Sequence, residues 1–104
     1  MKLINLTKRD LTEVTTGITY PGTDKPARLD IESMLVTKVG DTPIYSRKYG
    51  VLENLPPKQD GVLYIVSGVM LDIGRKQGRY DLVAPGDLVR DSKGKPLGCK
   101  GFCK

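Results

Sequence analysis

The sequence predicts a mainly β (α+β) protein, either a small antiparallel sheet or an open barrel with one short helix. Three observations predict it. Gly and Pro recur at short intervals, 12 and 7 times in 104 residues, which is typical of many short strands. Several segments are rich in β-branched residues and alternate apolar with polar positions. The length fits a single domain over residues 1–104, and no linker or internal repeat divides it.

The first half of the chain predicts strands and a hairpin. Leu3–Thr7 and Thr12–Tyr20 are β-prone segments. Pro21–Pro26 is a loop that no helix tolerates. Ala27–Val39 alternates with period two and turns at Gly40–Pro43 into a second strand, 44–49, which makes a hairpin.

The second half predicts the central strand and the helix. Gly50–Gly61 contains Pro56-Pro57 and is a surface connection. Val62–Val66 is the most apolar run, which indicates a strand buried on both faces. Ser67 then caps a helix through Val69–Ile73 that Gly74 or Gly78 ends.

The end of the chain predicts two further β elements. Leu82 and Val83 form a short strand before Pro85-Gly86. A last hairpin pairs Asp87–Arg90 with Leu97–Phe102.

Composition excludes several classes of protein. The chain has no histidine, which removes Ser-His-Asp and Cys-His catalysis and His-ligated zinc. Cys99 and Cys103 are too few for a four-thiolate metal site, and we expect ordinary reduced cysteines. No apolar run approaches the ~20 residues of a membrane span, and the start lacks a signal-peptide core. We expect a soluble cytoplasmic protein without a membrane partner. Since only 38% of the residues are hydrophobic, we also expect a homo-oligomer.

The excess positive charge lies in the last third of the chain. Up to Asp72 the 9 basic and 9 acidic residues cancel, whereas from Ile73 onward 8 basic residues face 3 acidic ones. This asymmetry indicates either a solvated basic end or a surface that binds phosphate groups or nucleic acid.

Five segments carry a family resemblance: Ile4–Thr7, Lys48–Pro56, Gly61–Ser67, Arg79–Gly86 and Val89–Phe102. In that order they resemble a family of small uncharacterised proteins encoded by bacteriophages, prophages and other mobile elements. The resemblance spans nearly the whole chain and implies a setting, the host bacterial cytoplasm, rather than an activity. Where family members tend to carry Pro-His after the opening Asn-Leu-Thr, this chain has Lys8-Arg9.

The first candidate site is the junction between the central strand and the helix. Ser67 and Gly68 offer a hydroxyl and free backbone N–H groups, which suit an anion, and Gly68 would allow a close approach. The alternative is that Ser67 only caps the helix. The spacing of a Walker phosphate loop is missing.

The second candidate site is a group of Arg and Asp residues in the last third. Arg79 and Arg90 could clamp a diphosphate through their planar guanidinium groups. The carboxylate of Asp81 or Asp91 could accept a hydrogen bond from a ribose hydroxyl or an adenine amino group. Arg75 belongs to the same set of residues. The alternative is a set of structural Arg–Asp pairs that tether loops.

The third candidate site is on the predicted hairpin. Tyr45, Arg47 and Tyr49 alternate along a strand and therefore share one face. That face could stack a base and hold a phosphate. It could equally pack against a partner subunit.

Together these observations predict a non-catalytic protein that binds and sequesters a small phosphorylated nucleotide ligand, without a cofactor or metal. In a phage-type setting the ligand could be a bacterial immune signal, such as an ADP-ribose derivative or a cyclic dinucleotide, so that the protein acts as an anti-defence sponge. Two alternatives stay open: a structural or accessory virion protein, and a basic nucleic-acid-binding module. The second is less favoured because Asp81, Asp87 and Asp91 interrupt the basic segment.

Overall fold

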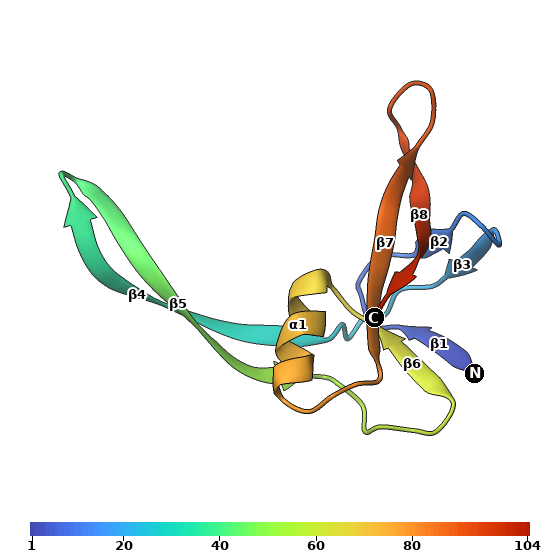
Figure 1. Ribbon diagram of the computed structural model, residues 1–104, viewed down its shortest axis with the longest axis horizontal. Helices are drawn as coiled ribbons and strands as arrows, with labels where there is room; N and C mark the ends of the chain where they lie inside the picture. Colours follow the sequence, from blue (N-terminus) through green and yellow to red (C-terminus); the bar gives the residue numbers. More distant parts are fainter.

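A computed structural model describes all of residues 1–104, as eight strands and one helix (Figure 1). Six strands form one sheet in the order β1-β6-β7-β8-β2-β3, and β4 and β5 form a separate hairpin. The predicted β-rich fold with one short helix is confirmed. The sheet is mixed rather than antiparallel, since β1–β6, β6–β7 and β2–β8 pair in parallel. The elements are β1 (Lys2–Asn5), β2 (Leu11–Glu13), β3 (Ile18–Tyr20), β4 (Arg28–Val39), β5 (Thr42–Glu53), β6 (Val62–Ile65), α1 (Gly68–Lys76), β7 (Leu82–Arg90) and β8 (Pro96–Cys103).

The core forms around the central strand β6, as its apolar sequence predicts. Tyr64, Ile65 and Val66 are each at most 1% exposed. Leu82 of β7 and Leu71 of α1 pack in the same core. The β6–α1–β7 unit is parallel because the helix carries the chain back to the starting edge of the sheet. No helix of the protein has both the length and the apolar character needed to cross a membrane.

The helix begins and ends where its capping residues lie. The Oγ of Ser67 accepts a hydrogen bond from the N–H of Met70 at 3.3 Å, which confirms Ser67 as the N-cap. The helix continues through Arg75 and Lys76, and Gly78 follows with φ +87°. Of the two predicted ends, Gly78 is therefore the one that stops the helix.

A buried asparagine joins the two ends of the six-stranded sheet. The Nδ2 of Asn5, at the end of β1, donates to the carbonyl oxygens of Arg9 at 2.8 Å and Tyr20 at 2.9 Å. Its Oδ1 accepts from the N–H of Thr7 at 2.9 Å. Tyr20 lies in β3, the opposite edge of the sheet. Asn5 thus links the sheet's first and last strands through satisfied polar contacts.

The segment Thr12–Tyr20 is two strands, not the one predicted. A turn that includes Gly17, at φ +74°, separates β2 from β3. The carboxylate of Glu13 accepts hydrogen bonds from the N–H groups of Thr15, Thr16 and Gly101 at 2.8–2.9 Å. These bonds, the one from Gly101 first, lower the pKa of Glu13 from 4.5 to about 2. One buried carboxylate therefore fixes the turn and ties it to β8.

The strand β7 is longer than predicted. It runs without a break through Pro85-Gly86, which the sequence indicates as an interruption. Its pairing with β6 ends at Val83, so Pro85 lies where that edge of β7 has no neighbouring strand. Gly86 is required here, because a Cβ at this position would overlap the carbonyl oxygen of Lys100 on β8.

The hairpin β4–β5 projects from the body as a long two-stranded arm (Figure 1). We call residues 28–53 the arm. The predicted hairpin is confirmed, but its turn is only Gly40–Asp41, because Thr42 and Pro43, predicted as turn, already belong to β5. The predicted connection after residue 49 begins only beyond Glu53. At its base Leu52 lies against α1, and the Nε2 of Gln77 donates to the carbonyl oxygen of Gly50 at 3.1 Å.

Candidate functional site

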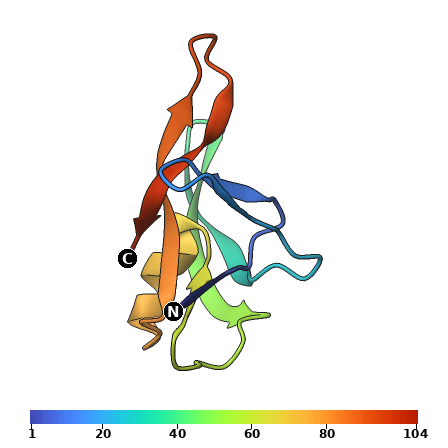
Figure 2. The same cartoon turned by 90° about the vertical axis from the view of Figure 1, so that its right-hand side faces the viewer.

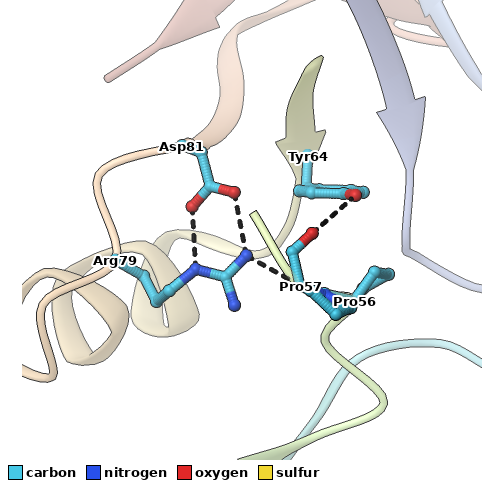
Figure 3. A network of polar contacts seen from close by, with 5 residues as sticks. All are labelled: Pro56, Pro57, Tyr64, Arg79 and Asp81. Carbon is cyan, nitrogen blue, oxygen red and sulfur yellow. Dashed lines mark hydrogen bonds and ion pairs between the residues drawn. The ribbon is translucent and has the colours of Figure 1, made fainter. Parts of the chain in front are cut away.

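Arg79 and Asp81 form a bidentate ion pair in the loop between α1 and β7 (Figure 3). The Nε and an Nη of Arg79 donate to the two carboxylate oxygens of Asp81 at 2.9 and 2.8 Å. The same Nη donates to the carbonyl oxygen of Pro56 at 2.8 Å. Tyr64 completes the network through its hydroxyl, which donates to the carbonyl oxygen of Pro57 at 3.3 Å.

The charges of this pair are matched to each other. Hydrogen bonding to Asp81 raises the pKa of Arg79, and hydrogen bonding to Arg79 lowers the pKa of Asp81. Asp81 is 4% exposed. The Asp81 carboxylate already occupies the Nε and one Nη of the guanidinium, the fork that a phosphate would otherwise use. The pair therefore holds the Pro56-Pro57 connection against the body, as the structural alternative for these residues expects.

Arg90 and Asp91 lie at the tip of the β7–β8 hairpin, where they brace its turn. An Nη of Arg90 donates to the carbonyl oxygen of Gly94 at 2.8 Å. The Oδ1 of Asp91 accepts from the N–H groups of Lys93 and Lys95, both at 2.9 Å. The two residues do not pair with each other. They organise the loop instead.

The predicted diphosphate clamp is not formed within one chain. Arg79 precedes β7 and Arg90 ends it, and the strand between them spans roughly 26 Å at about 3.3 Å per residue. Figure 2 shows α1 beside the lower end of β7 and the hairpin tip at the upper end. None of the five recesses on the surface is lined by Arg79 or Arg90. Their separation is a correction to the sequence-based prediction.

The junction at Ser67 and Gly68 is a capped helix start. The hydroxyl of Ser67 is occupied by the N–H of Met70. A Cβ at Gly68 would meet no atom within 4 Å, so this position does not need glycine for space. Arg75 is exposed in the last turn of the same helix, at the end away from Ser67. The structure therefore does not gather these three residues into one site.

Tyr45, Arg47 and Tyr49 are the predicted site residues that the structure does bring together. They alternate along β5 opposite Leu35, Ser33 and Ile31 of β4. Directly paired residues of an antiparallel ladder lie on the same face. We call these six residues the tyrosine face. Tyr45 is 58% and Tyr49 43% exposed, and Arg47 is exposed between them.

The guanidinium of Arg47 is not neutralised. Its cross-strand partner is the uncharged Ser33. The nearest charged pair on the arm, Glu32 and Lys48, lies on the opposite face because strand residues alternate. Arg79–Asp81 is the only ion pair in the protein. The tyrosine face thus presents one free cation flanked by two aromatic rings, about 7 Å from each along the strand.

A second basic feature, which the sequence does not predict, lies at the base of the arm. Lys8, Lys25 and Arg28 line a recess of about 460 Å³ together with Asp24, Pro26 and Asn54. Asn54 has φ +60° and donates to the carbonyl oxygen of Pro26 at 3.2 Å. Lys25 and Arg28 are three residues apart, but Lys8 comes from a distant part of the sequence, so no sequence motif marks the three cations together.

No protein-family model, curated protein or solved structure matches the chain. The resemblance to bacteriophage proteins therefore stays a prediction.

Proposed function

We propose that this protein is a non-catalytic binding protein that sequesters a small phosphorylated nucleotide ligand on the tyrosine face of its arm. The single observation that carries this proposal is the exposed row Tyr45, Arg47, Tyr49 with an unpaired guanidinium at its centre. A tyrosine ring offers a stacking surface to a base. Arginine offers a planar fork that matches phosphate oxygens.

The remaining residues support binding rather than turnover. Arg79 and Arg90, in the last third of the chain, each make hydrogen bonds within the chain. The pKa of Glu13 is lowered by its backbone hydrogen bonds, which suits a structural carboxylate rather than a general acid near neutral pH. In the phage-type setting that the resemblance implies, a sequestering protein for an ADP-ribose derivative or a cyclic dinucleotide needs affinity and no catalytic group.

The ligand must lie against an open surface in a single chain. None of the recesses includes Tyr45, Arg47 or Tyr49. Small-molecule sites bury most of the ligand between walls. High affinity on this face therefore requires a second wall, which a neighbouring subunit can supply.

Isothermal titration calorimetry with cyclic dinucleotides and ADP-ribose tests the proposal. We expect one of these ligands to bind the wild-type protein. Tyr45→Ala and Tyr49→Ala should each weaken binding roughly tenfold, because each stacked base contributes about 1–3 kcal/mol. Tyr80→Ala is the matched control, since Tyr80 is 66% exposed and lies outside the arm. No heat with any of these ligands, or equal losses in all three variants, would contradict the proposal.

A further inference from the structure

The chain exposes more surface than its mass warrants. Its accessible surface is 7532 Å². A compact monomer of 11.4 kDa would expose about 5,800 Å². The radius of gyration is 16.6 Å, where about 13 Å is typical for this length. The surplus of roughly 1,700 Å² exceeds the ~800 Å² that each partner of a standard protein interface buries.

The arm accounts for this surplus. Figure 1 shows it reaching away from the body, with contact only at its base near α1. An isolated two-stranded hairpin is marginally stable in water. Twelve residues in each strand extend the arm to about 40 Å, so most of its length has no covering layer.

The outer part of the arm, residues 34–44, carries exposed aliphatic side chains on both faces, with one charged strand residue, Lys38, near the tip. Leu35 belongs to the tyrosine face, and Met34 and Ile44 belong to the other face. These three side chains are 54%, 63% and 43% exposed, and Val39 near the tip is 69% exposed. A strand pair with large aliphatic residues on both faces is typical of one covered on both faces. The inner part differs, because its second face carries Asp30, Glu32 and Lys48.

Charge identifies the kind of partner. The arm contains four basic and four acidic residues and is neutral, so the whole net charge of +5 lies outside it. A neutral apolar surface is a poor match for nucleic acid, which selects Lys and Arg. Two identical neutral arms bring no net repulsion when they approach. Two arms can therefore pack against each other without charge repulsion, whereas two copies of the basic remainder of the chain would repel each other.

We infer that the outer part of the arm packs against a second copy of this chain and is the main contact of a homo-oligomer. The contact buries Met34, Leu35, Val39 and Ile44 of each copy. It leaves Arg47 and Tyr49 outside the contact. Tyr45, the cross-strand partner of Leu35, lies at its edge, beside the second copy. The inference does not depend on any ligand and extends the proposed function by naming where a second wall comes from.

The molar mass in solution, without ligand, tests this inference. We expect sedimentation equilibrium and light scattering, neither of which depends on shape, to give at least twice the chain mass. Met34→Glu/Ile44→Glu and Val39→Glu should give the mass of one chain with unchanged circular dichroism of the body. Val69→Glu is the matched control, since Val69 is 54% exposed on α1. A wild-type mass of one chain would overturn the inference, as would arm variants that stay associated.

A shortened arm gives a second and independent readout. Met34 and Ser46 are cross-strand partners, so an Asn-Gly turn can join them in place of residues 35–45. Figure 1 shows the outer end of the arm away from the body, and the shortened protein should fold as a monomer. Association of the shortened protein would overturn the inference. Failure of ligand binding in a wild-type oligomer would instead contradict only the proposed function.

Discussion

Arg79 holds Asp81 through two parallel hydrogen bonds of 2.9 and 2.8 Å, and a third bond of 2.8 Å joins it to the carbonyl oxygen of Pro56. These three hydrogen bonds give Arg79, which lies in the basic last third of the chain, a structural role. Two of the three guanidinium nitrogens are hydrogen-bonded within the chain, and the buried Asp81 carboxylate offsets the charge, so Arg79 stabilises the loop around Pro56-Pro57.

The first prediction concerns this pair. Arg79→Ala should lower the free energy of unfolding by about 2–3 kcal/mol, because it leaves the Asp81 carboxylate buried without its partner. Arg79→Lys should lose less, since it keeps the charge but not the fork. Urea denaturation measures both. An Arg79→Ala protein as stable as the wild type would show that the pair has no structural role.

The second prediction is a pH dependence due to Glu13. Its pKa is 4.5 ordinarily and about 2 in the folded protein, so the folded state favours the ionised form. Its contribution to stability is full above pH 4.5 and is lost as the pH falls toward 2. Urea denaturation between pH 6 and 2.5 should show this loss.

Glu13→Gln is the variant that isolates this effect. Glutamine has a single acceptor oxygen, and its NH2 group cannot accept a hydrogen bond. The N–H of either Gly101 or Thr16 therefore loses its acceptor. The variant should be less stable at pH 6 and should lose less on acidification, the remaining loss coming from groups such as Asp81, whose pKa is also lowered. Parallel pH profiles for the variant and the wild type would contradict the assignment.

The third prediction compares two glycines of positive φ. A Cβ at Gly98, where φ is +151°, would overlap the carbonyl oxygen of Thr12 at the contact between β8 and β2. Gly98→Ala should therefore destabilise the protein by about 3 kcal/mol or more. At Gly94, where φ is +80° and nothing lies within 4 Å, alanine should cost only about 1–2 kcal/mol. Thermal unfolding of both variants measures the difference. Equal losses of stability in the two variants would contradict a close approach of the Thr12 carbonyl oxygen to Gly98.

The sequence predicts local structure better than it predicts long-range pairing. The central strand, the cap at Ser67 and the hairpin of Ala27–Val39 with the strand that follows it each depend on residues close in sequence, and the structure confirms them. The contact that ties the β2–β3 turn to β8 runs from Gly101 to Glu13, 88 residues apart in the sequence, and no local pattern shows it. The parallel pairing of β1 with β6 is equally non-local.

The candidate sites divide in the same way. Tyr45, Arg47 and Tyr49 share a face because strand residues alternate, which sequence spacing alone determines. Whether Arg79 and Arg90 converge depends on the length of the strand between them. The sequence indicates a break at Pro85-Gly86, but β7 is continuous and keeps the two arginines at opposite ends. The exposure of the arm could not be predicted, because an apolar strand shows no sign of what covers it.

The titration that compares Arg47→Gln with Arg90→Gln tests the central claim, that the arm rather than the basic end of the chain binds the ligand. Using the nucleotide that binds the wild-type protein, Arg47→Gln should weaken binding roughly tenfold or more, as expected for the loss of a charge-assisted hydrogen bond. Arg90→Gln should leave the affinity unchanged, because Arg90 braces its own hairpin turn. The reverse outcome, with binding weakened by Arg90→Gln and kept in Arg47→Gln, would contradict the account.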